Sequence, residues 1–233
     1  MDGPPNRYMI SLDLAARIIE LYDHDEQIPC YGFGDVSTEA QSVFSFFDDN
    51  EPARGMEALL ERYKQIVASV HMSGPTSFAP LIRQAMRQVY GSGMKFHVLL
   101  ILAGGHVSEE CLEETKKAIV EAAELPLSIV VVGVADIKWT AMEDFKDELP
   151  ERSWDNFHFC ELRDVVGSSE RPFPEAEMED LFELDVLSEI PTQYIRALNL
   201  TRGQNRDSVA TIMNNTSTFS PLEPPIALTK IRG

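Results

Sequence analysis

The chain has 233 residues, of which 44% are hydrophobic and 25% are charged, an ordinary composition for a globular domain with a sizeable core. Lys and Arg number 20 against 38 Asp and Glu, which gives a formal net charge of −18. A surface this acidic repels phosphate backbones and anionic lipids. We therefore expect no nucleic-acid partner and no polybasic membrane anchor.

The cysteines and the apolar runs indicate in which cellular compartment the protein is expected. Cys30, Cys111 and Cys160 form no C-x-x-C pair, which excludes a disulfide framework and a cysteine-based zinc site within this chain. Charged residues interrupt the N-terminal segment, so it cannot form the core of a signal peptide. The apolar runs Phe96–Gly105 and Leu125–Ala135 have roughly ten residues each, against the ~20 that a membrane helix needs. We expect a protein of the cytosol or nucleus with reduced thiols and no transmembrane segment.

The chain opens with a helical pattern that gives way to short strands. Residues 6–24 carry apolar residues at helical spacing, which predicts one amphipathic helix. The segment Cys30–Gly34 predicts a short strand that ends in glycines. An aromatic run predicts a second strand over Val43–Phe47, bounded by a turn-like Asp-Asp-Asn sequence.

Two helices follow these strands. Pro52 is suited to open a long helix that runs through Val70, because proline is favoured in the first helical turn. After a loop, either Thr76 or Ser77 is suited to cap a second helix that extends to about Tyr90, since a hydroxyl can accept a bond from the first free N–H groups.

The next section is the most informative for fold. Continuous apolar runs alternate with helical patterns along Phe96–Leu102, Glu109–Glu124, Leu127–Val134, Thr140–Leu149 and Phe157–Leu162. Strands that are apolar on both faces and alternate with helices are typical of a parallel sheet covered on both sides. We predict a doubly wound α/β fold with a mostly parallel sheet.

The C-terminal part predicts a final helix and then a tail. A helical pattern spans Glu175–Leu200 and is interrupted at Pro191. The residues beyond it are rich in Asn, Ser, Thr and Pro and have few apolar anchors. We therefore place one domain over residues 5–202 and a disordered tail over 203–233.

Glycine-rich turns are the first candidates for a site. Tyr31–Asp35 (YGFGD) follows a strand but lacks the third glycine of a dinucleotide-binding fingerprint, and no phosphate-binding GK[ST] motif occurs. Leu102–Gly105 lies at the carboxyl end of a predicted strand, where open α/β sheets bind ligands. The alternative, a tight turn from strand to helix, stays open.

No catalytic constellation is visible. The chain has no G-x-S-x-G elbow, and its cysteines lack a local signature, which favours small buried hydrophobic roles. His97 and His158 lie in or beside apolar strands and are expected in the core or at strand edges. His106, in the turn after Gly105, is the best-placed histidine for a site. We expect no catalytic residue in this chain.

Seven motifs occur in a familiar order. They are IPCYGFGD (28–35), VFSF (43–46), SGPTSFAP (73–80), HVLLIL (97–102), LPLSIVVVGV (125–134), WDNFHF (154–159) and EIPTQY (189–194). With these motifs the sequence resembles the copine domain, a variant of the von Willebrand factor A fold, over about Pro5–Arg202. The motifs are most similar to those of the plant RING-type ubiquitin ligases that carry a copine domain (the RGLG group), rather than to those of the animal copines with tandem C2 domains.

The resemblance implies a metal-ion-dependent adhesion site, of which this chain matches little. Such a site uses a D-x-S-x-S loop after the first strand, a threonine in a second loop and an aspartate after the fourth strand. Thr76 matches the threonine, Gly104 stands in place of the aspartate, and the first loop is expected before Asn6. Asp35–Glu39 is similar to that loop but follows the second strand, so it is not assigned to the site. A threonine hydroxyl alone does not displace the water shell of Mg²⁺, so we predict no cofactor, with Mg²⁺ bound weakly at most.

The resemblance also gives the expected function. We predict a non-catalytic protein-interaction domain with a degenerate metal site, whose binding rim consists of Thr76, Gly104, Gly105 and His106, and whose partners are other proteins. The alternative is the substrate-binding part of a RING-type ubiquitin ligase. Residues after Thr201 contain neither cysteine nor histidine, so these residues cannot supply RING activity.

One strand of the family pattern is missing. In the usual order 3-2-1-4-5-6 the first strand is central, so the strands at Ile28–Gly34 and Phe96–Leu102 lose their shared neighbour. Their unpaired backbone groups are costly beside apolar side chains. The sheet must close up, borrow a strand from a partner or the N-terminus, or be unstable. We interpret the chain as a truncated or divergent copy.

Overall fold

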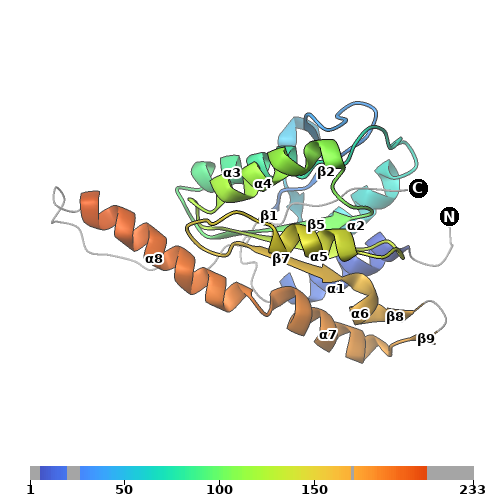
Figure 1. Cartoon of the computed structure of the whole chain (residues 1–233). Coiled ribbons are helices and arrows are strands. Elements are labelled where there is room, and N and C mark those ends of the chain that lie inside the picture. The colour runs from blue at the N-terminus through green and yellow to red at the C-terminus, as the bar shows by residue number, and fades with distance from the viewer. Residues whose placement is uncertain (1–5, 20–26, 169–170, 209–233) are drawn as a thin grey trace.

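The computed structural model describes residues 6–19, 27–168 and 171–208. Figure 1 shows a sheet with helices above and below it and one long C-terminal helix that extends beyond the body. The elements along the described chain, apart from the short ones given below, are α1 (Arg7–Ile19), β2 (Tyr31–Phe33), β3 (Val43–Ser45), α2 (Gly55–Ile66), α3 (Ala79–Gly91), β5 (His97–Ala103), α4 (Leu112–Ala122), β6 (Leu127–Gly133), α5 (Thr140–Asp147), β7 (Phe157–Glu161), α7 (Glu175–Leu187) and α8 (Ile190–Ser208).

The three continuous apolar runs form one parallel sheet, as predicted. Its order is β5-β6-β7, with His97 opposite Leu127 and Ile129 opposite Phe157 at the amino ends of the two pairings. All seven residues of β6 are buried, because this central strand is covered on both faces and paired on both edges. The predicted mixed α/β fold with a parallel sheet is confirmed.

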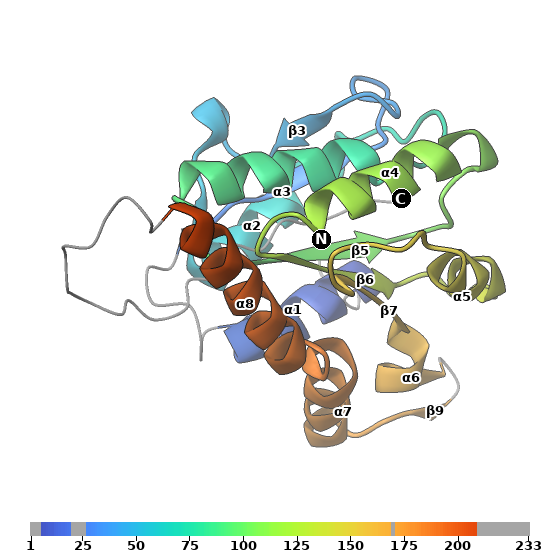
Figure 2. The ribbon, with the colours of Figure 1, turned by 60° about the vertical axis from the view of Figure 1, so that its left-hand side comes forward.

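Alternate residues of β5 divide the core into two layers. Leu99 and Ile101 pack beneath α3, α4 and α5, whereas Leu100 and Leu102 pack against α1, α2 and α7. Figure 2 shows α3 and α4 on one side of the sheet and α1 and α7 on the other. Each fully buried leucine or isoleucine contributes about 1.5–3 kcal/mol of transfer free energy, so both layers stabilise the sheet.

A separate hairpin continues the sheet layer beyond β5. The strands β2 and β3 pair antiparallel with Gly32 opposite Phe44, and α3 contacts β2, β3, β5 and β6. Phe33 shares a core cluster with Leu99, while Cys30 shares the other cluster with Leu100. The hairpin therefore lies between the same two helical layers, although among the described strands it does not pair with β5.

The predicted start of the second helix is wrong. Residues Ala53–Arg54 instead form β4, which pairs antiparallel with β1 (Gln27–Ile28). The helix begins at Gly55, whose φ of +78° breaks the extended backbone before it. Ala53 is fully buried, so tertiary pairing outweighs the preference of a proline at position 52 for the first helical turn.

The predicted cap of the third helix also differs. The residue before α3 is Phe78, and no side chain caps the helix. Ser77 Oγ only accepts a 3.3 Å hydrogen bond from the N–H of Ala79. Pro80 lies in the first turn, where its missing N–H removes one of the donors that a cap would have satisfied.

Short elements interrupt the predicted helical and irregular segments. The helix expected over Glu109–Glu124 begins with a 3₁₀ turn before α4. The sequence did not predict the short helix after β7 or the small hairpin that follows it. The short elements are η1 (Asp48–Asn50), η2 (Glu109–Cys111), α6 (Leu162–Val166), β8 (Gly167–Ser168) and β9 (Arg171–Pro172).

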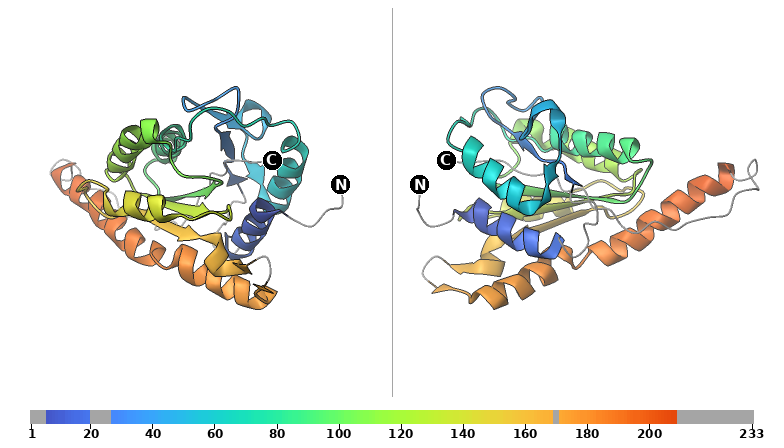
Figure 3. Two further views of the ribbon diagram at one scale, coloured as in Figure 1. Left: turned by 45° about the vertical axis from the view of Figure 1, so that its right-hand side comes forward. Right: turned by 180° about the vertical axis from the view of Figure 1, so that it is seen from behind.

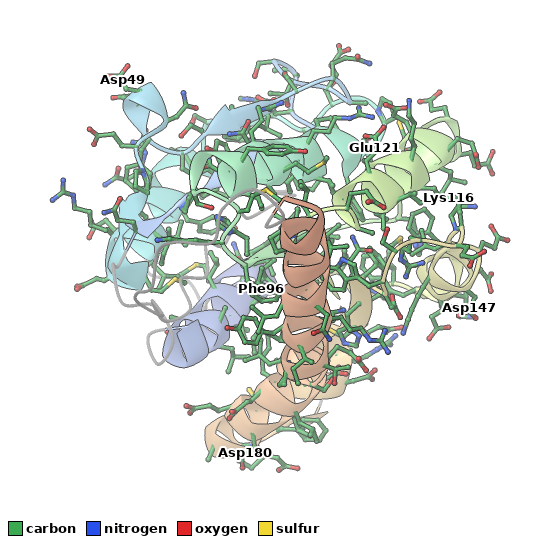
Figure 4. All side chains as sticks on the ribbon, turned by 90° about the vertical axis from the view of Figure 1, so that its left-hand side faces the viewer. Asp49, Phe96, Lys116, Glu121, Asp147 and Asp180 are labelled. Atoms are coloured by element: carbon green, nitrogen blue, oxygen red, sulfur yellow. The ribbon has the colours of Figure 1, made fainter. Side chains whose placement is uncertain are left out.

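The predicted C-terminal helix is two helices. The chain breaks between α7 and α8, and Pro191 lies in the first turn of α8 rather than at the break. Gln193 Nε2 donates a 3.1 Å hydrogen bond to the carbonyl of Asp155, and the ring of Tyr194 meets Phe96 edge-on at 5.2 Å. Figure 4 views the molecule with Phe96 close to α8. The contacts anchor α8 at the amino ends of the strands.

The predicted tail begins where α8 is still helical. The structure describes α8 as far as Ser208, past the boundary that we placed at residue 202. The rest of that tail, residues 209–233, lies outside the described residues. Figure 3 shows α8 extending away from the sheet. In the portion of the chain that is described, no helix has both the length and the apolarity needed to cross a membrane.

Candidate functional site

The candidate site lies at the carboxyl edge of the sheet. The strand β5 ends at Ala103, and Gly104, Gly105 and His106 follow in the turn. Gly104 and Gly105 are buried and His106 is half-buried. Carboxyl ends of parallel strands form the usual ligand-binding edge of such folds, so this turn is placed where a site is expected.

Thr76 is joined to the same edge by two reciprocal hydrogen bonds with Ser108. Its N–H donates a 2.7 Å hydrogen bond to Ser108 Oγ, and the N–H of Ser108 donates a 3.0 Å bond to the carbonyl of Thr76. The structure therefore joins the loop before α3 to the turn after β5. All four residues predicted for the rim lie on these two joined segments.

A tryptophan that the sequence analysis did not single out supports His106. The His106 ring meets Trp139 edge-on at 5.0 Å between centroids. Trp139 is 1% exposed and donates its indole N–H to the carbonyl of Ala135 over 3.1 Å. Trp139 also packs against Phe159 at 5.6 Å between ring centroids, and these contacts hold its ring beside the imidazole.

A glycine at the end of β6 makes room for that tryptophan. A Cβ added to Gly133 would lie 2.5 Å from Cε2 of Trp139, well inside van der Waals contact. Glycine within a strand often marks such a close approach. Gly133 was the available sequence signal, although it did not identify the tryptophan as the ring concerned.

The Asp35 loop lies near Thr76 but uses its carboxylate internally. The N–H of Ser73 donates a 3.1 Å bond to the carbonyl of Gly34, which ties the loop to the segment before Thr76. Asp35 accepts bonds from the hydroxyls of Ser37 and Thr38 and from the N–H of Thr38. Burial raises the pKa of Asp35, but these hydrogen bonds outweigh it and leave the pKa below its ordinary value. The Asp35 carboxylate thus stabilises the turn that it belongs to.

Two carboxylates near the carboxyl ends of β6 and β7 also have partners within the chain. Asp136 lies 3.4 Å from Arg163 and 3.7 Å from Arg7. Glu161, at the end of β7, lies 3.4 Å from Arg163. These ion pairs neutralise the acidic side chains that a cation would otherwise attract.

Among the described residues, few oxygen ligands lie at the position that the resemblance implies for a divalent cation. Thr76 supplies one hydroxyl, while Gly104 has no side chain to supply a carboxylate. Across residues 6–19, 27–168 and 171–208, no group of three or more His, Cys, Asp or Glu side chains is arranged to hold a metal. Mg²⁺ requires several well-placed oxygen ligands before it gives up water.

The cysteines have the environment of buried hydrophobic residues, as predicted. All three are buried. Burial raises the pKa of Cys30 to about 12, and burial together with nearby acidic charge raises the pKa of Cys160 well above its ordinary value. A thiol must lose its proton to act as a nucleophile, so these two residues are unreactive at neutral pH.

The histidines in strands β5 and β7 form hydrogen bonds to backbone carbonyl groups. The Nδ1 atom of His97 lies 2.8 Å from the carbonyl of Lys95, and Nε2 of His158 lies 2.8 Å from the carbonyl of Asp185. Both distances fit donation from the ring, which satisfies a loop or helix-end carbonyl. These contacts agree with the expected core and strand-edge positions.

Comparisons with known proteins find copines and plant ubiquitin ligases that are similar to this chain. It is 42% identical over 206 residues to the E3 ubiquitin-protein ligase RGLG5 of Arabidopsis thaliana, covering 84% of this chain and 47% of that protein. It is 38% identical over 236 residues to RGLG1 of the same plant, covering 97% and 46%. Copine family protein 1 of Caenorhabditis elegans is 38% identical over 192 residues, covering 81% and 16%. The chain thus spans about half the length of these two plant relatives.

A solved structure and a family profile complete the comparison. The manganese-loaded Plasmodium vivax TRAP protein is similar over 66% of this chain and 59% of that chain, with a TM-score of 0.44 and 10% identity. The copine profile matches residues 1–206, nearly the whole chain. The chain therefore belongs to the copine family.

Proposed function

We propose that this chain is a non-catalytic protein-interaction domain that binds its partners at the carboxyl edge without a metal ion. The observation that carries the proposal is the buried pair Gly104–Gly105 at the position where the family resemblance implies an aspartate. Without that carboxylate a partner cannot be bridged through a cation. Direct polar and apolar contacts must then provide the affinity.

The rim has groups suited to such contacts. The Nδ1 atom of His106 is buried and has no hydrogen-bond partner within the described part of the chain, while its ring is half-buried against Trp139. On the adjoining loop, Val36 is 59% exposed, and its N–H is bonded to the carbonyl of His71. A fixed aromatic surface with a polar edge and an exposed aliphatic group are features of protein-binding sites.

Quantitative affinity capture from a plant extract, with the bound proteins identified by mass spectrometry, tests the rim. We expect His106→Ala and Thr76→Ala each to reduce recovery of the same set of proteins. Tyr90→Ala is the matched control, because Tyr90 is 61% exposed and lies at the C-terminal end of α3, away from the rim. Equal recovery with all three variants would remove the rim from the proposal.

Calorimetric titration tests the metal part separately. We expect Mg²⁺ and Mn²⁺ to give no saturable heat with the folded chain, because the described residues provide too few oxygen ligands. Saturable binding with micromolar affinity would contradict this, and a Thr76→Ala variant would then show whether the hydroxyl is a ligand.

A second function, the substrate-binding part of a ubiquitin ligase, is favoured by the plant relatives. RGLG5 and RGLG1 are named E3 ubiquitin-protein ligases, and this chain matches 47% and 46% of their lengths. An autoubiquitination assay on the product of the full transcript distinguishes the two functions. A signal that needs a cysteine-rich segment encoded downstream would favour the ligase, whereas its absence would leave the interaction domain.

A further inference from the structure

A groove lies between α1 and α2, on the side of the sheet opposite α3 and α4. The two helices contact one another, and the right-hand view of Figure 3 shows them side by side. The groove has a volume of about 320 Å³, at the lower end of the range of about 300–1,000 Å³ for ligand pockets. None of its lining residues belongs to the rim at the carboxyl edge. They are Asp13, Ala16, Met56, Glu57, Leu60, Glu61 and Lys64.

The floor of the groove is apolar. Met56 is 2% exposed and Ala16 is 7% exposed, and both belong to the core layer that α1 and α2 cover. Leu60 is half-buried and packs against the same layer. Because Met56 and Leu60 are four residues apart, they are neighbours on one side of α2. An aliphatic group laid on this floor would remove further apolar surface from water.

Carboxylates surround this floor. Asp13 on α1 and both Glu57 and Glu61 on α2 are exposed. The lining contains one basic residue, Lys64, so three carboxylates face a single ammonium group. Glu57 and Glu61 are four residues apart on one helix, where like charges repel one another. A positive charge brought to the rim from outside would relieve that repulsion.

We propose that the groove between α1 and α2 docks a basic amphipathic segment of a partner protein. The aliphatic stems of its lysine or arginine side chains lie on Ala16, Met56 and Leu60, and their charged ends meet the carboxylates of the rim. Long cationic side chains bury their stems in this way while the charge stays in water. The groove is a second binding surface, and it does not depend on the proposed function of the carboxyl edge.

Charge selects this occupant among the alternatives. The net charge of −18 attracts a basic segment and repels a second copy of the same chain. Nucleic acids and anionic lipids are repelled for the same reason. A metal ion does not fit either, since among the described residues no three His, Cys, Asp or Glu side chains are arranged to hold one.

Methyl NMR on the full chain with isotope-labelled methionine tests the proposal, because one methionine lies in the floor of the groove. The probe is a capped helical peptide of alanine, leucine and lysine, with its lysines four residues apart. We expect this peptide to shift the methyl resonance of Met56 until the site is saturated. Met142 is the internal control, since it is 1% exposed in the core layer on the other side of the sheet. The same peptide with glutamate in place of lysine should shift neither resonance.

Charge reversal at the rim tests whether the groove is the site. Glu57→Lys combined with Glu61→Lys should weaken binding of the lysine peptide at least about fivefold at low salt. Glu143→Lys combined with Asp147→Lys is the matched control, because it makes the same change of charge at two exposed positions four residues apart on α5. Figure 4 labels Asp147. The control pair should leave the affinity nearly unchanged.

Three results would overturn the proposal. One is a methyl resonance of Met56 that the lysine peptide does not shift. Another is equal weakening by the two double variants, which would show a general attraction to the acidic surface. The third is a shift of Met56 that grows with protein concentration without peptide, together with a dimer in light scattering, because a second copy would then occupy the groove.

Discussion

Replacing Gly133 by alanine tests the packing that supports the rim. The added Cβ would lie 2.5 Å from Cε2 and 2.8 Å from Cδ2 and Cζ2 of Trp139. These atoms belong to a rigid ring that is 1% exposed and bonded to the carbonyl of Ala135, so the contact cannot be relieved by rotating a flexible chain end. Overpacking of a tight core costs about 1–3 kcal/mol, and we expect Gly133→Ala to lower the free energy of unfolding by that amount.

Urea unfolding followed by far-ultraviolet circular dichroism measures this cost, provided that the slope of the transition is unchanged. Gly91→Ala is the control, because an added Cβ at Gly91 meets nothing within 4 Å. Gly91 ends α3, so alanine there should be neutral or stabilise by up to about 1 kcal/mol. A Gly133→Ala protein as stable as the wild type would refute the packing argument.

A double-mutant cycle assigns the cost to the tryptophan. Trp139→Leu removes the ring atoms that the new Cβ would meet, so Gly133→Ala should cost at least about 1 kcal/mol less in that background. An equal cost in both backgrounds would place the strain elsewhere. The His106 ring rests on Trp139, so Gly133→Ala should also shift the imidazole resonances in NMR spectra.

Three further predictions concern individual side chains. The pKa of Asp35 is lowered in the folded chain, so the ionised carboxylate stabilises the fold at pH values above its ordinary pKa of about 3.9. This stabilisation is lost as the pH falls through the lower pKa of the folded chain. Asp35→Asn should therefore flatten the acid side of a plot of melting temperature against pH, and an unchanged acid side would contradict this. The thiol of Cys30 should resist iodoacetamide at about pH 8 until urea unfolds the chain, and rapid labelling of the native protein would show that it is accessible. Asn156 is fully buried and its Nδ2 donates a 3.0 Å bond to the carbonyl of Ile119, so Asn156→Ala should lower the free energy of unfolding by about 1–3 kcal/mol, and a loss below about 0.5 kcal/mol in urea titration would show that this bond matters little.

The sequence predicted the parallel sheet because that sheet is specified by local composition. Strands buried on both faces need continuous apolar runs, and the runs at β5, β6 and β7 are long enough to be distinguished from amphipathic helices. The three cysteines and the strand histidines followed from the same pattern. His106 could be assigned to the carboxyl edge because it follows the end of a predicted parallel strand, whereas Thr76 was assigned to the site only through the resemblance to the copine domain.

The features that sequence reasoning missed depend on distant partners. Ala53 joins a strand because it pairs with Ile28, and a proline before it gives no sign of that pairing. Trp139 supports His106 only because Gly133 leaves space across the end of β6. The short helix and hairpin after β7 have too few residues for a recognisable period.

The most direct test of metal-independent protein binding at the rim is quantitative affinity capture performed in parallel with EDTA and with Mg²⁺. The account predicts equal recovery of the same proteins under both conditions, with His106→Ala reduced equally in each. Loss of those proteins in EDTA and their return with Mg²⁺ would contradict it.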